Sequence, residues 1–580
     1  MSPTYLRQIF TRHAATILCG CLLVFMGGNL LANAWRASLT NDELVHIPSA
    51  YQYLRTGNFR LNPEHPPLAK MWASLPLLVV NPRVYLEPDG ADQQFARFTV
   101  LASLEFWQRN ELRFHAIAFW SRVPMVLLTL TLGVLIYVYG LQLFGARAAL
   151  MAVALFTLEP TMLAHGWIVH TDVAAAFGYL LFFFTLHAYL RASTLSRALW
   201  LGLATGVALL IKFSMIILIP ILAVALVYLF VKAPSFGVSR RTFILHACLM
   251  FAVLVLLVNA AYYFQHPALA NPELRFIVDT APTSRAAERI TGSLRLLSKV
   301  LPTYYIFGLY TVFVHNHLGH PTSLLGQASV FGWWYYFPVA FALKTSLPFL
   351  LLSVVAAGWS LYACVMGRDK RFVPLLIGLG IYLVASMNSN VNIGVRHIAP
   401  VFPFLFLLGG ACLDWTLKWS RVRLARGLVA ILLGWMLVDC IRAYPDYLAF
   451  TNALTFGKPG WALLADSNVE WGQDIGELAR YLQARGETNL VGALSAGWAT
   501  PPMYGIKLLD IPPPDLQLST TEYVAIGAGF LNGASVPAGI KDENGVELND
   551  EQRRNYFAKY RALKPERVFG NSIYLYRKQE

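Results

Sequence analysis

Long apolar stretches decide the fold of this chain, such as residues 213–231, which read FSMIILIPILAVALVYLFV and contain no charged side chain. A helix needs about 20 mostly apolar residues to cross the hydrocarbon core of a bilayer. Across the 580 residues, 56% are hydrophobic and 13% are charged, whereas soluble domains average about 25% charged residues. The composition excludes disordered, collagen-like and disulfide-scaffold proteins and indicates a polytopic α-helical membrane protein.

Ten further apolar runs bring the expected number of spans to about eleven. They cover residues 14–34, 117–140, 147–163, 171–190, 197–211, 242–263, 346–366, 372–387, 398–415 and 424–443. Several are short, and the two runs that flank Lys212 could form one broken helix. The first run, preceded by Arg7 and Arg12 and ending in Ala32-Asn33-Ala34, also resembles a cleavable signal peptide, although it is long enough to span.

Basic residues predict the orientation of the spans, because cytoplasmic loops are enriched in Lys and Arg. With the N-terminus inside, the short outer connections contain only Lys212 and Arg396. The inner segments contain Arg7, Arg12, Arg147, Arg191, Arg197, Lys232, Arg240, Arg241, Arg368, Lys370, Arg371, Lys418, Arg421, Arg423 and Arg426. The loops 35–116 and 264–340 and the tail 444–580 then lie outside. We therefore expect a multi-pass protein of the cytoplasmic (inner) membrane whose active site faces the periplasm or exterior.

Charge and cysteine usage exclude other classes. The net charge is +14, but residues 444–580 contain 13 Lys and Arg against 16 Asp and Glu, so the positive excess belongs to the membrane part. No basic patch or motif indicates a nucleic-acid partner. The cysteines lie in or beside apolar runs and look like small apolar side chains rather than disulfides or zinc ligands: Cys19, Cys21, Cys248, Cys364, Cys412 and Cys440.

The tail is expected to form a second domain. A transmembrane domain would cover residues 1–443, including both outer loops, and a small α/β domain on the outer face would cover 444–580. Periodicity predicts strands and an amphipathic helix in this tail, and its Pro-Pro sequences mark loops. The expected strands are 489–494, 522–528 and 572–576, and the helix is 475–485.

Two polar motifs in the first outer loop contain candidate site residues. Asn41-Asp42-Glu43 follows the first span, and its two acids are either solvated loop residues or part of a catalytic centre. Glu64-His65-Pro66-Pro67-Leu68-Ala69-Lys70 leads into the apolar run 71–80, which is too short to span and suits a helix in the membrane interface. Such a helix would hold Glu64, His65 and Lys70 near one another, although a simple turn with a lysine reaching the interface fits equally.

Charged residues also interrupt the apolar runs. Glu159 precedes Pro160, and Asp172 opens the fourth span. Acids at membrane depth are costly and usually face a cavity, but Asp172 could also cap a helix. Arg396 and His397 lie in the polar turn between spans nine and ten, where an arginine can bind a phosphate through two hydrogen bonds.

Two more stretches are ambiguous. Lys344 follows the aromatic cluster 333–338, which is more typical of an interfacial belt than of a platform for sugars. In the tail, the segment 466–474 is dense in polar groups and contains Asp466, Trp471 and Gln473. Its Asp474 could cap the following helix, or the indole of Trp471 could offer a flat face to a carbohydrate.

Taken together, these motifs resemble those of the GT-C membrane glycosyltransferases. Asp42-Glu43, the His65-Pro66-Pro67-Leu68 segment and Thr171-Asp172 are similar to motifs of the protein O-mannosyltransferases (glycosyltransferase family 39) and the bacterial lipid A aminoarabinose transferases. A bacterial branch of the group is similar in its later motifs: Trp334-Tyr335-Tyr336-Phe337-Pro338-Val339 with Lys344, Gly394-Val395-Arg396-His397, and residues 466–474. The similarity covers most of residues 36–480.

The resemblance implies a GT-C enzyme that transfers sugar from a polyprenyl-phosphate-linked donor, in the membrane lipid, to a protein, lipid or glycan acceptor. It implies Asp42 as the general base. We expect the remaining candidates to serve the same site as follows: Glu43 and Asp172 in the catalytic centre; His65, Lys70, Lys344, Arg396 and His397 at the donor phosphate; Glu159, Asp466, Trp471 and Gln473 at the substrates. Glu64 matches an acid that binds metal in the aminoarabinose branch, but His65 replaces that branch's lysine. A divalent metal is therefore left open, and no other cofactor is expected.

Two alternatives come from other functional classes. A transporter or flippase of an envelope precursor would also use broken helices with charged midpoints, and an envelope-assembly scaffold would need no catalytic residues. The chain has no internal repeat, and two long outer loops with an outer domain suit an enzyme better than a transporter. The sugar, the acceptor, the prenyl length and the oligomeric state are not decided by the sequence.

Overall fold

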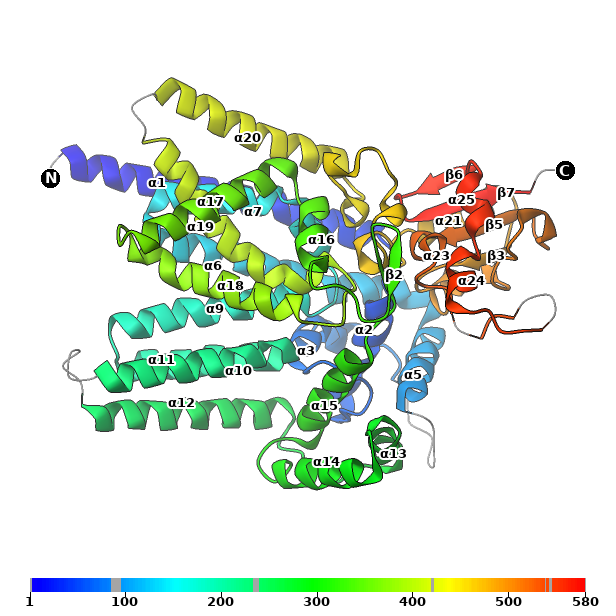
Figure 1. The fold of residues 1–580 in the computed structure, drawn as a ribbon, viewed down its shortest axis with the longest axis horizontal. Helices are drawn as coiled ribbons and strands as arrows, with labels where there is room; N and C mark the ends of the chain where they lie inside the picture. The colour runs from blue at the N-terminus through cyan, green and yellow to red at the C-terminus, as the bar shows by residue number, and fades with distance from the viewer. Residues whose placement is uncertain are drawn as a thin grey trace.

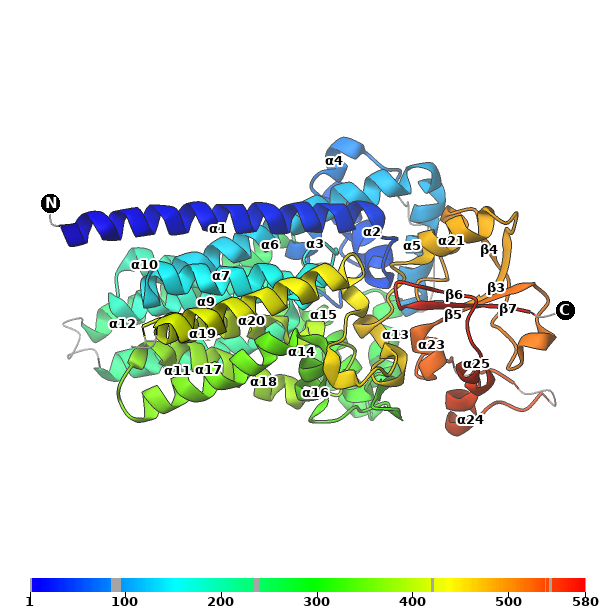
Figure 2. The ribbon, with the colours of Figure 1, turned by 90° about the horizontal axis from the view of Figure 1, so that it is seen from above.

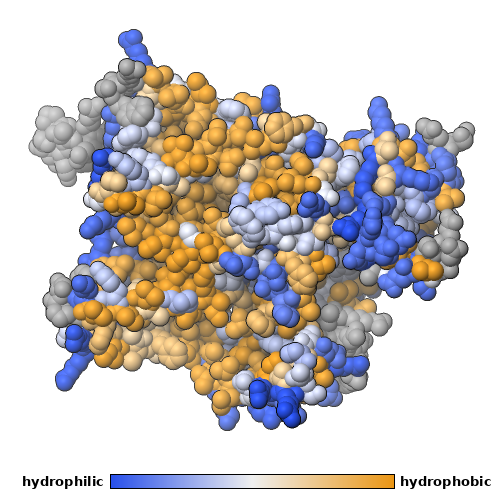
Figure 3. Space-filling model, viewed as in Figure 1, coloured by the Kyte–Doolittle hydropathy of each residue, from blue (hydrophilic) through white to orange (hydrophobic). Residues whose placement is uncertain are grey.

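A bundle of long helices with a smaller sheet-containing domain at one end makes up the structure, a computed structural model (Figures 1 and 2). It describes residues 3–84, 95–232, 239–418, 422–537, 539–541 and 545–578. In Figure 3 the surface of the bundle is largely hydrophobic, whereas the sheet-containing domain is mostly hydrophilic. This contrast is what a bundle in lipid and a domain in water require.

Helices occupy all eleven positions expected for spans. They are α1 (Pro3–Arg36), α6 (Phe114–Phe144), α7 (Ala146–Leu158), α9 (Asp172–Arg191), α10 (Leu195–Ile211), α11 (Leu218–Lys232), α12 (Arg240–Ala261), α17 (Leu347–Val365), α18 (Val373–Met387), α19 (Phe402–Thr416) and α20 (Val422–Ala443). In the described part of the chain, nine helical segments are long and apolar enough to cross a membrane, while α7 and α10 are shorter. The polytopic helical architecture is confirmed; the count of eleven and the orientation stay predictions.

The connections at one end of the bundle are built from shorter helices. Both long loops lie at the end where the sheet domain sits, opposite the N-terminus (Figure 1). The first contains α2 (Asn41–Thr56), α3 (Leu68–Ser74), α4 (Leu77–Val80), α5 (Phe95–Arg109) and η1 (Glu111–Arg113). The second contains α13 (Asn271–Thr280), α14 (Ser284–Leu297), α15 (Thr303–Leu318), β1 (Thr322–Leu324), β2 (Gln327–Ser329) and α16 (Tyr336–Lys344).

The apolar run 71–80 is not one helix. It is divided between α3 and α4, with α3 ending at Ser74 and Pro76 standing just before α4. Pro76 has no N–H to donate to the carbonyl of Trp72, so the helical hydrogen-bonding pattern is interrupted there. The short helices still place His65 and Lys70 close to α2.

The sheet domain, defined here as the chain from α21 (Ile475–Gln483) to β7, has five strands in the order β4-β3-β5-β7-β6. Strand β3 runs parallel to β4 and β5, and β7 runs antiparallel to β5 and β6. The three expected strands and the expected helix are present, and the short strands β4 and β6 were not anticipated. The bounds are β3 (Asn489–Ala493), β4 (Lys507–Leu508), β5 (Tyr523–Gly527), β6 (Arg567–Phe569) and β7 (Ile573–Arg577), with helices α22 (Thr500–Met503), α23 (Ala528–Asn532), α24 (Asp550–Asn555) and α25 (Ala558–Ala562).

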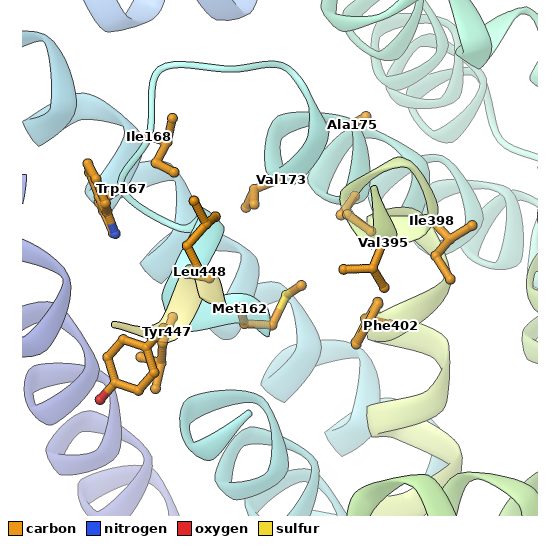
Figure 4. Packing of buried hydrophobic residues seen from close by; sticks show 14 of the residues in the cluster. Met162, Trp167, Ile168, Val173, Ala175, Val395, Ile398, Phe402, Tyr447 and Leu448 are labelled. Carbon is orange, nitrogen blue, oxygen red and sulfur yellow. The ribbon is translucent and has the colours of Figure 1, made fainter. Parts of the chain in front are cut away.

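Hydrophobic packing joins the segments that carry the polar candidates. Helix α8 (Pro160–His165) and the loop after it pack with the start of α9, with η5 (Val395–Val401) before α19, and with η6 (Tyr447–Ala449) after α20 (Figure 4). The buried residues in this contact include Met162, Ile168, Val173, Val395, Phe402 and Leu448. Because protein interiors are close-packed, this core fixes how the polar groups beside it meet.

Asp474 ties the sheet domain to the segment that precedes it. Its Oδ2 accepts a hydrogen bond from Ser572 Oγ at 2.6 Å, beside β7. Gly570 has φ +52°, and a Cβ there would lie 2.2 Å from Asp474 Oδ2. Burial raises the pKa of the Asp474 carboxyl to about 7, and the hydrogen bond from Ser572 only partly opposes this rise.

This raised pKa predicts how stability depends on pH. The folded state holds a proton on Asp474 up to about pH 7, whereas the unfolded chain loses it near pH 4, so stability should fall as the pH rises between these values. Between pH 5 and pH 8, the unfolding temperature of wild-type protein should therefore fall relative to that of an Asp474→Asn variant. The Asp474→Asn variant lacks this contribution but keeps those of other buried groups, such as Glu470, whose pKa burial also raises to about 7. An unchanged pH profile in that variant would contradict the assignment.

Candidate active site

Charged residues from four separate segments meet at the end of the bundle beside the sheet domain. Asp42 lies in the first turn of α2, Asp172 begins α9, Arg396 lies in η5, and Lys212 follows α10. Arg396 Nη1 donates to Asp42 Oδ2 at 2.8 Å and to Asp172 Oδ2 at 3.3 Å. Lys212 Nζ donates to the other Asp172 oxygen. Two carboxylates therefore share two cations, as a buried charge cluster requires.

Asp42 is the more accessible carboxylate of this cluster. Its side chain is 24% exposed, against 6% for Arg396 and 1% for Asp172. Burial by itself would raise the pKa of Asp42, but the positive charge of Arg396, together with His46, lowers it below the usual range. Asp42 is consequently ionised at neutral pH and can be reached from outside the cluster.

Ser467 and Trp471 also contact the guanidinium of Arg396. Its Nε donates to Ser467 Oγ at 2.9 Å, and its guanidinium lies 4.0 Å from the centre of the Trp471 ring. Gly394 has φ +148°, and a Cβ at that position would come within 2.5 Å of Ser467 Oγ. A glycine is thus needed for the turn before Arg396 to approach Ser467.

The segment 466–474 fastens the first outer loop to the Arg396 turn. The backbone N–H of Asn41 donates to Trp471 O, and that of Ser38 donates to Gln473 O, both at 2.9 Å. Asn468 accepts from the N–H of Val395 at 3.0 Å. The Gln473 side chain accepts from the Trp471 N–H at 2.8 Å and so bonds within the segment itself.

Trp471 does not offer an open face to a sugar. Its residue is 3% exposed, and its ring contacts Arg396 and, at 5.7 Å between centroids, His170. The carbohydrate-stacking interpretation is therefore replaced by one in which the indole stabilises the guanidinium through a cation–π contact. Gln473, whose amide is occupied by its own segment, is likewise a positioning residue.

Glu43 points away from Asp42 although the two are adjacent in sequence. It is fully buried, and Arg122 Nε and Nη2 donate to its two oxygens at 2.8 and 2.7 Å. The backbone N–H groups of Thr40 and Val169 donate to the same carboxylate at 2.9 and 3.2 Å. The bonds from Arg122 hold the loop to α6, and the bond from Val169 holds it to the loop before α9. These contacts favour a structural role for Glu43 over the expected catalytic one.

The side chains of Lys70 and Lys344 are both buried and hydrogen-bonded within the protein. Lys70 Nζ lies 2.8 Å from Asn62 O and 3.3 Å from the Tyr53 hydroxyl, and the residue is 1% exposed. Lys344 Nζ donates to Leu448 O at 2.7 Å and to Asn468 O at 2.5 Å. Burial lowers the pKa of Lys344 to about 7. Neither ammonium is offered to a phosphate, because each is enclosed by carbonyls that it stabilises.

The histidines of the expected set are differently placed. His65 packs edge-on against His46, with 5.3 Å between ring centroids, and in the described part of the chain its buried Nδ1 has no hydrogen-bond partner. Burial lowers the pKa of His65 well below its ordinary value, so the ring is neutral. His397 stacks on Phe337 at 6.4 Å. Both rings lie within electrostatic reach of Asp42 and Lys212.

Three remaining candidates lie outside this cluster. Glu159 is fully buried and accepts from the N–H of Ser346 at 3.3 Å, and Ser346 Oγ donates to Asp439. Asp466 adopts φ +57° and lies 4.0 Å from His320. Glu64 is exposed, and among the described residues no group of three or more His, Cys, Asp or Glu side chains could hold a metal ion. Glu64 is therefore not part of such a group in the described residues, and the metal that the sequence left open has no support here.

Sequence reasoning missed two members of the cluster. The sequence showed Lys212 only as one of two basic residues in the short outer connections. A lone basic residue near the membrane needs an acidic partner, and this could have indicated its pairing with Asp172. His46 lies four residues after Asp42 in α2, and residues at this spacing share one helix face.

The chain is similar to one protein family and to several solved structures. The family model described as dolichyl-phosphate-mannose-protein mannosyltransferase matches residues 114–263, about a quarter of the chain. No curated protein sequence matches the chain. The Pmt1-Pmt2 protein O-mannosyltransferase complex of S. cerevisiae, solved with its sugar donor, has 12% identity and a TM-score of 0.50, with 81% of this chain and 92% of that chain covered.

Two further solved structures are similar. ArnT from Cupriavidus metallidurans in the apo state has 13% identity and a TM-score of 0.48, covering 97% of this chain and 98% of that chain. The archaeal oligosaccharyltransferase AglB from Archaeoglobus fulgidus has 13% identity and a TM-score of 0.45, and 80% of this chain matches 58% of that chain. The likeness to Pmt1-Pmt2 shows a similar fold, and together with the family match it agrees with the resemblance to GT-C membrane glycosyltransferases.

Proposed function

We propose that this chain transfers a sugar from a polyprenyl-phosphate-linked donor to a hydroxyl acceptor on a protein, lipid or glycan, at the outer face of the cytoplasmic membrane. The observation that carries the proposal is the 2.8 Å contact between Asp42 and Arg396, which are 354 residues apart in the chain. This contact sets an accessible carboxylate beside a fixed cation where the two long loops meet the bundle. Transfer from a lipid phosphate needs both groups at one place.

The two groups would act on opposite ends of the reaction. Asp42 takes the proton from the acceptor hydroxyl as its oxygen attacks the anomeric carbon of the sugar. The bond between that carbon and the phosphate oxygen breaks, and the polyprenyl phosphate leaves with the bonding electrons. Arg396 and Lys212 stabilise the negative charge that develops on the phosphate. A single displacement of this kind inverts the anomeric centre.

Asp172 would position the cations rather than touch the substrate. It is 1% exposed and contacts both Lys212 and Arg396. When Arg396 turns toward the donor phosphate, its contact with Asp42 weakens, and the pKa of Asp42 rises toward a value suited to a base. The unpartnered Nδ1 of His65 could accept or donate a hydrogen bond at the same phosphate, with His397 beside it.

Arg396→Lys is expected to lower kcat/KM by roughly ten- to a hundredfold. Lysine keeps the charge but cannot reach Asp42, Asp172 and Ser467 together, and a hydrogen bond to a charged group contributes about 1.5–3 kcal/mol. Steady-state transfer by the purified variant in proteoliposomes measures this. Arg295→Lys in the outer helix α14 is a matched control, because that residue takes no part in the cluster. Equal loss in both variants would contradict the role of Arg396.

The function itself is tested with defined donors. Wild-type protein in proteoliposomes should release free polyprenyl phosphate from a polyprenyl-phosphate hexose or pentose when a hydroxyl acceptor is present. The glycans and glycolipids of a deletion strain, analysed by mass spectrometry, should lack one sugar. Counterflow of a solute across the membrane without any donor, and no release of polyprenyl phosphate, would favour the transporter instead.

A further inference from the structure

A groove of about 820 Å³ runs along one edge of the sheet domain. It follows β4, the outermost strand of the sheet, which lies beside β3 in Figure 2. Three glycines contribute to its lining, Gly492, Gly497 and Gly505. The groove is large enough for a ligand of substantial size, since binding pockets typically measure about 300–1,000 Å³.

The backbone of β4 leaves one side of this edge open. The N–H groups of Lys507 and Leu509 donate to Thr488 O at 2.7 Å and Leu490 O at 2.9 Å, on the β3 side. Because the bonding direction alternates along a strand, Leu508 turns its N–H and C=O away from β3. An exposed strand edge of this kind is a template for an added strand.

The walls of the groove are apolar and accessible. Trp498, Leu509 and Ile511 are 37%, 38% and 40% exposed. Only four of the lining residues have polar side chains, namely Thr488, Asn489, Lys507 and Asp510. A glycan would need a denser set of hydrogen-bonding side chains, whereas apolar walls and a free edge suit a polypeptide in extended conformation.

One wall of the groove lies near the candidate active site. Trp498, which lines its wall, donates from Nε1 to Asn41 Oδ1 at 2.9 Å. Asn41 immediately precedes Asp42. An extended chain advances about 3.3 Å per residue, so a segment leaving the groove past Trp498 reaches Asp42 within a few residues.

We propose that this groove holds the acceptor, an extended polypeptide segment that adds to the β4 edge and presents a serine or threonine hydroxyl to Asp42. The inference rests on the proposed function, and it specifies where the acceptor docks and what selects it. Selection acts on the acceptor's backbone and on apolar side chains near the modified residue. The covalent step is the one described above, with the hydroxyl proton passing to Asp42 and polyprenyl phosphate leaving.

The test measures binding and transfer separately. The probe is a fluorescent peptide of alternating valine and threonine, about ten residues long with lysines at its ends. Its Kd for wild-type protein in detergent is compared with that for Ile511→Glu and Leu509→Glu, which place a charge on the groove wall at exposed positions. Leu518→Glu is the matched control, because Leu518 is exposed in the same domain but does not line the groove.

We expect Kd to rise at least about tenfold in the two groove variants and to stay unchanged in Leu518→Glu. The KM for the peptide in sugar transfer should rise with it, while release of polyprenyl phosphate with a small alcohol as acceptor should be unaffected. Equal Kd in all variants would overturn the inference, as would an oligosaccharide that binds in an Ile511-dependent manner while the peptide does not. If wild-type protein binds the peptide in the groove but releases no polyprenyl phosphate with any acceptor, the proposed function fails independently of the groove.

Discussion

Replacing Asp42 with asparagine is expected to lower the rate of sugar transfer by about 10²–10⁴-fold, the usual contribution of a general base. The amide keeps an oxygen that can accept from Arg396 at the same place, so the cluster should stay assembled. What is lost is the ability to take the acceptor's proton. Single-turnover transfer from a polyprenyl-phosphate sugar measures this directly, because it separates chemistry from donor binding.

Two comparisons make this result specific. Binding of the polyprenyl-phosphate sugar should change little in Asp42→Asn, since the phosphate is assigned to Arg396 and Lys212. Asp279→Asn is a matched control in the second long loop, where the acid is 59% exposed and pairs with Arg275 of the same helix. Transfer at the wild-type rate by Asp42→Asn would remove Asp42 as the base, and with it the mechanism proposed above.

The helices of the bundle were predictable because each span is recognised from its own residues alone. A span must present about 20 apolar residues whatever its neighbours are, so each of the eleven runs became a helix. The structure even separates the two runs that flank Lys212, with a 3-10 turn, Phe213–Ile217, after that lysine. The short strand β4 carries no such local signal, since two residues show no periodicity, and its pairing with β3 arises only in three dimensions.

Convergence of the site was predictable, but the direction of each side chain was not. Arg396, one of only two basic residues in the short outer connections, was among the expected site residues, whereas Lys212, the other, was not. The motifs indicated Asp42 as the base, but no sequence pattern showed that Glu43 pairs with Arg122, or that Lys70 and Lys344 are enclosed by carbonyls. Those outcomes depend on which helix packs against each loop, here α6 with Arg122 against Glu43.

The Arg122–Glu43 pair is expected to be among the most costly contacts to break. Replacing Arg122 with methionine keeps much of the side-chain volume but leaves Glu43 as a buried carboxylate without its cation, in a pair whose side chains are 1% and 0% exposed. Breaking a buried pair in this way costs about 3–5 kcal/mol. It also frees the carbonyls of Ala34, Ala37 and Ser38, which Arg122 now holds. Thermal unfolding in detergent should show a clear loss of stability.

A double variant distinguishes this structural role from a catalytic one. Adding Glu43→Gln to Arg122→Met removes the stranded charge, so part of the lost stability should return and the two changes should be non-additive. The protein that folds should then transfer sugar at a rate close to that of wild type, because Asp42 and Arg396 are untouched. Wild-type stability combined with complete loss of transfer in Glu43→Gln alone would show instead that Glu43 takes part in the reaction. Glu43 would then be the base in place of Asp42. A carboxylate that anchors the loop through Arg122 cannot also receive the acceptor's proton.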